Sequence, residues 1–190
     1  MRIVLLGAPG SGKGTQGTRL AERLGVPHVS SGELLRRHID EGTELGGRAA
    51  DFVARGELVP DDLVLAIVGQ AVADARATGG YVLDGYPRSL AQAEQAYAMA
   101  VPRGDTADAV VYLSVPDGVV RERLAGRGEG RADDADPEVV ERRLQVFHEL
   151  TEPLLDFYRD RGILVTIDAS GTPDEVATAI DAALETLPRQ

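Results

Sequence analysis

Residues 7–16 read GAPGSGKGTQ, a glycine-rich segment between the apolar run Arg2–Leu6 and the amphipathic run Lys13–Leu24. The pattern GxxxxGK between a strand and a helix is typical of a phosphate-binding loop, because glycine lets backbone N–H groups approach an anion closely. The helix that begins near Lys13 adds the positive end of its dipole. We therefore predict a phosphate site on this loop. Its residues are Gly10, Ser11, Gly12, Lys13, Gly14 and Thr15.

Lys13 is the only lysine of the chain, whose other basic side chains are all arginines. A compact ammonium fits among the β- and γ-phosphates inside such a loop, whereas a planar guanidinium is wider. The usual pattern places a serine or threonine directly after the lysine, where its hydroxyl binds Mg²⁺. Here Gly14 occupies that position. Either Thr15 contributes a hydroxyl, or magnesium is held largely through water.

Composition limits the classes of function. The chain has 190 residues, of which 43% are hydrophobic and 27% charged, as is typical of one soluble globular domain. The net charge of −11 argues against a general nucleic-acid binder. The absence of cysteine excludes disulfides and thiolate metal sites. The first apolar run is too short for a signal-peptide core or a membrane span, so we expect a cytoplasmic protein.

Short apolar runs alternate with longer amphipathic segments along the chain, which predicts a parallel sheet covered by helices on both faces. The expected strands are Arg2–Leu6, Val26–Ser30, Tyr81–Asp84, Ala109–Val115 and Ile163–Ile167. The expected helices are Lys13–Leu24, Gly32–Glu41, Leu45–Arg55, Asp61–Ala77, Leu90–Ala100, Pro116–Ala125, Pro173–Leu187 and one from Pro137 toward Arg161. Asp136 is the expected N-cap of that last helix, and Pro153 should bend or break it.

A second motif, LDGYPRSLAQ at residues 83–92, follows another predicted strand. Asp84 ends the strand, where folds of this kind carry a carboxylate on the magnesium side. Gly85 and Pro87 predict an irregular turn that presents Arg88 at the end of the sheet. Because ligands bind at the carboxyl ends of parallel strands, we expect the loops after Gly7 and Asp84 to converge.

With these motifs the sequence resembles the short-lid adenylate kinases, within the nucleoside monophosphate kinases. The chain also contains SSGELLR (30–36), ELVPDDLV (57–64), GRADD (130–134) and TEPLLDFY (151–158) in the family order. The resemblance implies an α/β P-loop fold of three layers with a five-stranded parallel sheet, a small helical AMP-binding excursion and a short lid. It implies a core of residues 1–30, 61–125 and 137–190, an AMP-binding region at 31–60 and a lid at 126–136.

The resemblance implies reversible, magnesium-dependent transfer of the ATP γ-phosphoryl group to AMP, giving two ADP. The catalytic residues that it implies are Lys13, Arg88, Arg127, Arg131 and Arg143. To the phosphate loop it adds Arg123, Arg127 and Gly171 for ATP. The AMP residues that it implies are Ser31, Arg36, Glu57, Leu58, Val59, Gly85, Tyr86, Pro87, Arg88, Gln92, Arg131 and Arg143. Gln92 would read the adenine edge, and Asp84 and Thr15 would hold Mg²⁺ through water.

The resemblance implies one functional arginine on the helix after the lid, where Arg142 and Arg143 are both candidates. Helical periodicity distinguishes between them. Arg142 shares its face with polar residues, namely Glu138, Gln145 and Glu149. Arg143 shares its face with apolar residues, namely Val139, Val146 and Leu150. We therefore predict that Arg143 points inward and Arg142 outward. The same periodicity places Arg123 and Arg127 on one face of their helix.

Three other classes of protein are alternatives. A UMP/CMP kinase also has a short lid, but Gln92 and Ser89 favour AMP as the acceptor. A switch or motor NTPase would carry a serine or threonine at position 14 and a guanine-reading loop. A regulator without catalysis would not need five arginines for phosphate. We expect ATP, AMP and ADP as ligands, no nucleic-acid or membrane partner, no structural zinc, and a monomer.

Overall fold

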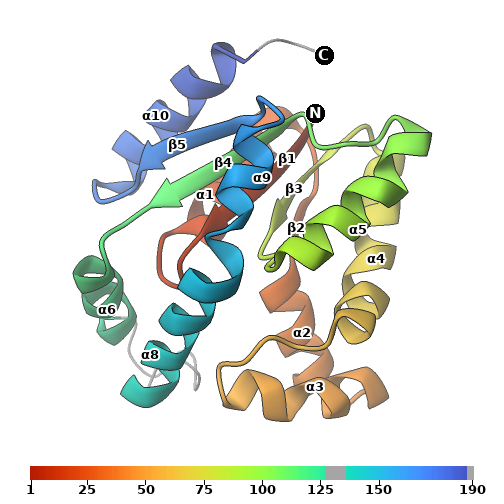
Figure 1. The fold of residues 1–190 in the computed structure, drawn as a ribbon, viewed down its shortest axis with the longest axis vertical. Helices are drawn as coiled ribbons and strands as arrows, with labels where there is room; N and C mark the ends of the chain where they lie inside the picture. Colours follow the sequence, from red (N-terminus) through yellow and green to blue (C-terminus); the bar gives the residue numbers. More distant parts are fainter. Residues whose placement is uncertain (127–135, 188–190) are drawn as a thin grey trace.

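The computed structural model describes residues 1–126 and 136–187. Five strands form one parallel sheet in the order β2-β3-β1-β4-β5 (Figure 1). The strands are β1 (Arg2–Gly7), β2 (His28–Ser30), β3 (Tyr81–Asp84), β4 (Ala109–Ser114) and β5 (Leu164–Asp168). The predicted five-stranded parallel sheet is confirmed, with one- or two-residue shifts at strand ends.

Helices connect the strands, and all of those described except α1, which follows Gly12, begin at a side-chain cap or a proline. Those in the described residues are α1 (Lys13–Leu24), α2 (Ser31–Asp40), α3 (Glu44–Ala54), α4 (Asp61–Ala77), α5 (Leu90–Ala100), α6 (Asp117–Ala125), α8 (Pro137–Val146), α9 (Leu154–Arg159) and α10 (Pro173–Glu185). A 3₁₀ turn, η1 (Val101–Arg103), follows α5. The predicted start of α8 is confirmed, because the Asp136 carboxylate accepts a hydrogen bond from the Glu138 N–H at 2.9 Å and Pro137 is the first helical residue.

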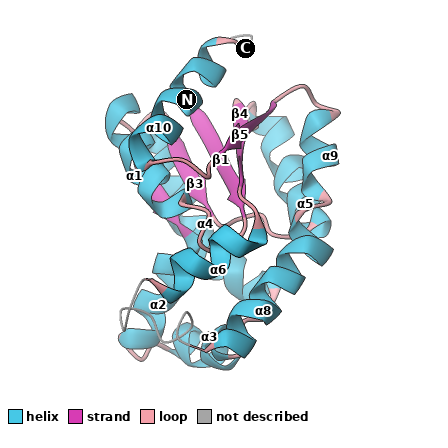
Figure 2. Cartoon of the chain, turned by 90° about the vertical axis from the view of Figure 1, so that its left-hand side faces the viewer, coloured by secondary structure: helices cyan, strands magenta, loops and turns pink. Residues whose placement is uncertain are grey.

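Helices cover both faces of the sheet, as Figure 2 shows. In β1, Ile3 and Leu5 are fully buried in a cluster with residues of α1 and α10. Val4 and Leu6 point to the opposite face and join a larger cluster with α4, α5 and α9. Because both faces are buried, the strand sequence shows no polar alternation. Helices α2, α3, α6 and α8 lie beyond the carboxyl ends of the strands (Figure 1).

The break in the predicted helix from Pro137 toward Arg161 is confirmed, but its form differs from the prediction. A π-helical turn, η3 (Phe147–Thr151), follows α8, and α9 begins directly after Pro153. The Glu152 N–H reaches back five residues to the Phe147 carbonyl at 2.9 Å. The wider turn rotates the chain, so that Leu150 is 42% exposed while Thr151 is buried. The inward placement predicted for Leu150 is therefore wrong.

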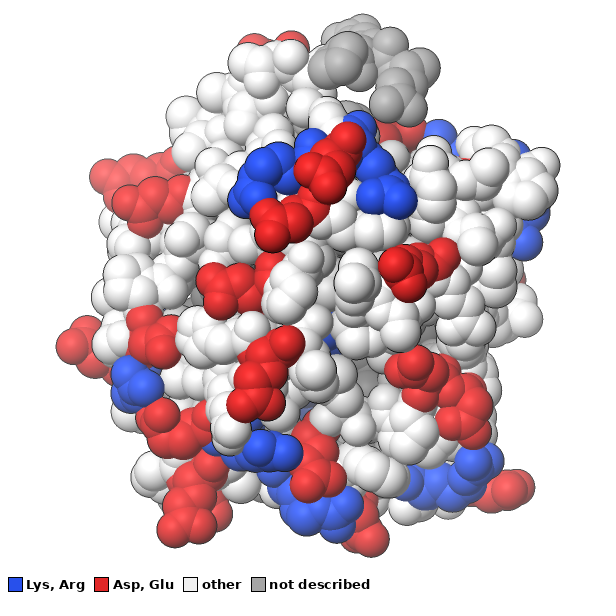
Figure 3. All heavy atoms as spheres, in the orientation of Figure 1, with Lys and Arg blue, Asp and Glu red and all other residues white. Residues whose placement is uncertain are grey.

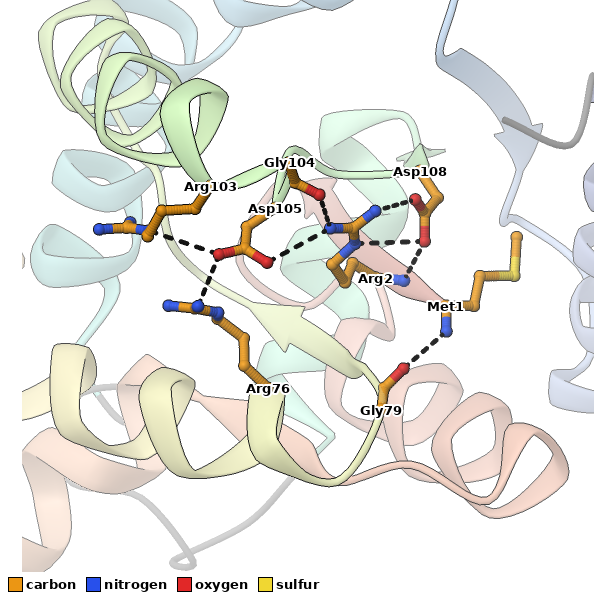
Figure 4. A network of polar contacts seen from close by, with 8 residues as sticks. All are labelled: Met1, Arg2, Arg76, Gly79, Arg103, Gly104, Asp105 and Asp108. Carbon is orange, nitrogen blue, oxygen red and sulfur yellow. Dashed lines mark hydrogen bonds and ion pairs between the residues drawn. The ribbon is translucent and has the colours of Figure 1, made fainter.

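A network of ion pairs and hydrogen bonds stabilises the end of the sheet where the strands begin, opposite to their carboxyl ends (Figure 4). The Arg2 side chain donates to both oxygens of Asp108, at 2.7 Å and 3.5 Å, and the Arg2 backbone N–H donates to the same carboxylate at 2.6 Å. Asp105 lies between Arg2, Arg76 and Arg103, with its closest approach at 2.6 Å to Arg76. The network joins β1 to the segment before β4 and to the end of α4, away from the glycine loop.

Charged side chains of both signs are interspersed over the face shown in Figure 3. Across the part of the chain that the structure describes, none of the helices combines the length and the apolar character that a membrane crossing needs.

Candidate functional site

The glycine loop leaves β1 at Gly7 and enters α1 at Lys13. Gly12 is the N-cap of α1 with φ of 96°, a left-handed conformation that glycine adopts without strain. No side chain caps this helix end. The first N–H groups of a helix have no intrahelical partner, so here they are directed toward any anion that the loop surrounds.

The Lys13 side chain folds back over its own loop. Its ammonium donates to the backbone carbonyls of Gly7 at 2.7 Å and Ala8 at 2.9 Å. These bonds place the positive charge at the carboxyl end of β1, beside the start of α1. The arrangement presents an ammonium and a helix N-terminus to the same volume, which favours phosphate.

Asp84 ends β3 at this edge of the sheet, where it pairs in register with Leu5 of β1 and Ser30 of β2. The residue is only 7% exposed. His28 lies behind it, with Nε2 4.0 Å from the Asp84 Oδ2. Sequence reasoning assigned no role to His28, so it missed this neighbour of Asp84.

The turn after Asp84 orients Arg88. Gly85 has φ of 78°, and the Tyr86–Pro87 peptide is cis, so the predicted irregular turn is present. The Arg88 Nε donates to the Gly85 carbonyl at 2.7 Å, and the Ser31 hydroxyl donates to that carbonyl at 2.7 Å. Thr151, buried by the π-turn, donates to the Arg88 carbonyl at 2.7 Å. Sequence reasoning missed Thr151, because its burial depends on the π-turn.

These segments surround one cleft of about 370 Å³. Four of the predicted basic side chains line it together with Asp84, and these are Lys13, Arg36, Arg88 and Arg143. The loop residues Gly10, Gly12, Gly14 and Thr15 and the turn residue Gly85 also line it. Ser11 is buried beneath the loop at 2% exposure. Four cationic side chains of an acidic protein thus line one cleft, which suits a polyanionic ligand.

Gln92 lies beside this cleft and is only 2% exposed. Its carbonyl oxygen accepts from the Arg88 N–H at 2.7 Å, and its amide nitrogen donates to Asp61 at 2.5 Å. Gln92 lines a small cavity with Ser31, Leu58, Val59 and Arg88. The cavity holds about 20 Å³, roughly the space of one water molecule. A larger ligand group would enter only if the walls move apart.

Two further residues expected in this region lie close by. Tyr86 is 6% exposed, and its burial, helped by the charge of Asp61, raises the pKa of the phenol to about 12. Tyr86 therefore stays protonated at neutral pH and does not serve as a base there. Glu57, in the segment between α3 and α4, pairs with Arg55 at 3.1 Å.

Arg142 and Arg143 lie as their helical faces predict. The Arg143 side chain passes over Gly56, where an added Cβ would lie 2.9 Å from its Cγ, and it lines the cleft. Arg142 is exposed and donates to the side-chain amide oxygen of Gln145 at 3.0 Å. Only Arg143 is therefore in position to contact a ligand in the cleft.

On the far side of the glycine loop, Arg123 extends from the end of α6. It donates to the Ser170 carbonyl at 3.1 Å and to the Gly171 carbonyl at 3.3 Å, just after β5. The structure thus brings together Arg123 and Gly171, which were both expected near ATP. Arg127 and Arg131 lie outside the described residues, and so does most of the expected lid.

The model of the adenylate kinase family matches residues 5–163. The adenylate kinase of Mycobacterium tuberculosis H37Rv is 49% identical over 176 residues, which cover 93% of this chain and 94% of that protein. That of Stenotrophomonas maltophilia is 46% identical over 187 residues, covering 97% of this chain and 100% of that protein. That of Xanthomonas oryzae is 47% identical over 186 residues, which cover 97% of this chain and 99% of that protein.

Proposed function

The chain belongs to the adenylate kinase family, and on this premise we propose how its cleft transfers the γ-phosphoryl group of ATP to AMP. The chain is an ATP:AMP phosphotransferase. The proposal therefore assigns residues to the binding of ATP, AMP and magnesium and to the transfer step. The observation that carries it is the convergence of four cations from four segments on one cleft. They are Lys13, Arg36, Arg88 and Arg143.

ATP binds on the side of the glycine loop in this proposal. The N–H groups of residues 10–15 and the Lys13 ammonium hold its β- and γ-phosphates. The adenine lies near Arg123 and the backbone of Gly171, which are already in contact with each other. Arg127 is assigned to the ATP phosphates by the family resemblance alone.

AMP binds on the opposite side, between α2 and the turn after β3. Arg36 and Arg88 bind its phosphate, because both line the cleft beside Ser31 and Gly85. Its base lies along Gln92 and the backbone from Glu57 to Val59, and entry widens the small cavity there. Residues 31–60 therefore act as the movable AMP-binding region, and residues 1–30, 61–125 and 137–190 as the core.

Magnesium fits the donor set of this cleft. Within the described ranges, no cluster of three or more histidine or acidic side chains could hold a metal by itself. Mg²⁺ often uses one or two carboxylates, several waters and substrate phosphates instead. Asp84 and Thr15 line the cleft and would hold the hydrated ion beside the phosphates. When bound, it neutralises charge on the transferred group.

The reaction needs positioning and charge neutralisation more than covalent participation by the protein. Arg88 and Arg143 both line the cleft that Lys13 enters, so they can contact the phosphoryl group as it passes between the nucleotides. Arg131 is assigned to the same task by resemblance. The acceptor is already an ionised phosphate, so no general base is required.

A coupled assay of ADP formation from MgATP tests the proposal, with AMP, UMP, CMP and GMP as separate acceptors. Strong preference for AMP is the expected result. Comparable rates with UMP or CMP would retain the mechanism but change the acceptor, and no transfer to any acceptor would contradict the proposal. The monomeric state and the cytoplasmic location stay predictions from the sequence.

A further inference from the structure

The Gln92 side chain can take only one amide orientation between its two partners. The Asp61 carboxylate is an acceptor without a hydrogen to donate, so it must face the NH₂ group of Gln92, at 2.5 Å. The Arg88 N–H is only a donor, so it must face the Gln92 carbonyl, at 2.7 Å. A flipped amide would place acceptor against acceptor and donor against donor at a side chain that is 2% exposed.

One donor and one acceptor remain on Gln92 after these two bonds. The amide nitrogen keeps its second hydrogen, and the carbonyl oxygen keeps its second lone pair. Adenine carries an amino donor at position 6, whereas guanine carries a carbonyl acceptor there. An amide in a fixed orientation therefore matches one of these edges, and an amide that can flip matches both.

We propose that Asp61 is a positioning residue that sets the base selectivity of the acceptor site by fixing the amide orientation of Gln92. This inference rests on the proposed role of Gln92 in binding AMP. Asp61 comes from the first turn of α4, while Gln92 comes from the first turn of α5. The pair therefore joins the start of α4, directly after the AMP-binding region, to the start of α5, directly after the turn that carries Arg88.

The chain offers a matched control in the neighbouring residue. Asp62 is in the same helical turn and carries the same charge, but its carboxylate pairs with Arg48 at 3.3 Å on the surface. Replacing either aspartate removes one acidic group from the start of α4, so effects on the helix dipole and net charge are alike. Only Asp61→Ala removes the partner of Gln92.

The experiment measures kcat and KM for AMP and for IMP, a 6-oxo purine nucleotide, in the wild type, Asp61→Ala, Asp61→Asn and Asp62→Ala. We expect Asp61→Ala to lower the AMP/IMP ratio of kcat/KM by about tenfold or more, mainly through a higher KM for AMP. Asp61→Asn should retain part of the preference for AMP over IMP, because the asparagine carbonyl can still accept a hydrogen bond from Gln92. The AMP/IMP ratio of Asp62→Ala should stay within about twofold of the wild-type ratio.

Gln92→Met, measured alongside, separates this inference from the proposed function. If Gln92→Met lowers the ratio while Asp61→Ala leaves it unchanged, Gln92 binds the base but Asp61 does not position it. If neither variant changes the ratio, both the inference and the proposed AMP role of Gln92 are overturned. Equal losses in Asp61→Ala and Asp62→Ala, or a wild type that accepts IMP as readily as AMP, would also overturn the inference.

Discussion

Gly17 of α1 and His28 of β2 fit against each other without room for another atom. A Cβ added to Gly17 would lie 2.4 Å from the His28 Nε2. The imidazole occupies the space that this side chain would fill, and its Nε2 lies 4.0 Å from Asp84 Oδ2. The glycine in the middle of a helix therefore makes room for a ring that lies behind the carboxylate of the cleft.

Gly17→Ala should destabilise the protein, although alanine favours helix more than glycine does by about 1 kcal/mol. Overlap with the imidazole should cost more than this gain, about 1–3 kcal/mol. In a His28→Ala background the overlap is absent, so the same substitution should stabilise. Denaturant unfolding of the wild type, the two single variants and the double variant measures the coupling, which we expect near 2 kcal/mol. Equal effects of Gly17→Ala in both backgrounds would rule out the proposed contact.

Arg143→Ala should reduce turnover by at least about 100-fold, because an arginine that stabilises the transferred phosphoryl group can contribute 10³–10⁵ in rate. The turnover of Arg142→Ala should stay within about twofold of the wild-type value, since the Arg142 side chain is exposed and bonds to Gln145. Steady-state kinetics with MgATP and AMP compare the two neighbouring substitutions directly. Similar losses in both variants would mean that the position of Arg143 in the cleft does not decide its role.

Local patterns predicted the elements that carry the site. The bounds of α4, β3 and α5 agree with the sequence prediction, because Pro60 and Ser89 mark the starts of the two helices. The face of Arg143 was predictable from Val139 and Val146, which both precede the π-turn. These signals are short-range and follow the ordinary helical period.

Contacts that depend on tertiary packing were not predictable. The π-turn places Thr151 rather than Leu150 inward, and a helical period of 3.6 residues does not include such an insertion. Asp61 and Gln92 are 31 residues apart and meet only because the first turns of α4 and α5 are adjacent in the fold. The sequence interpretation placed Asp61 in the first turn of its helix, which is confirmed, but its partner came only from the structure.

Lys13→Ala should lower turnover by about 10³-fold or more, because no other side chain places an ammonium among the phosphates. Lys13→Arg should also be strongly impaired, since a planar guanidinium is wider than the ammonium that donates to the Gly7 and Ala8 carbonyls. Both variants should keep the circular dichroism spectrum of the wild type. Turnover near the wild-type value in Lys13→Ala would contradict the role of the loop lysine.

The Arg2–Asp108 pair predicts a pH dependence of stability at the end of the sheet far from the cleft (Figure 4). Burial by itself would raise the pKa of Asp108. Hydrogen bonds from the Arg2 side chain and backbone N–H outweigh it, so the pKa of Asp108 is lowered from its ordinary value of 3.8. A lowered pKa in the folded state means that the ionised carboxylate stabilises the fold above pH 3.8, and that this stabilisation is lost as the pH falls through the folded-state pKa.

Asp108→Asn should therefore lower the free energy of unfolding at pH 7 by about 1 kcal/mol, a value reduced for the partial exposure of the pair. The difference from the wild type should shrink as the pH falls below about 4 toward the lowered folded-state pKa, because protonation of Asp108, first in the unfolded and then in the folded wild type, removes the contribution of its charge. Asp181→Asn is the control, since Asp181 pairs with Arg23 at 2.7 Å but is 40% exposed, and it should cost less than about 0.5 kcal/mol. Urea unfolding at pH 7 and at pH 3 measures both variants. A deficit for Asp108→Asn that is the same at the two pH values would show that the asparagine disturbs packing and that the charge of Asp108 does not stabilise the sheet.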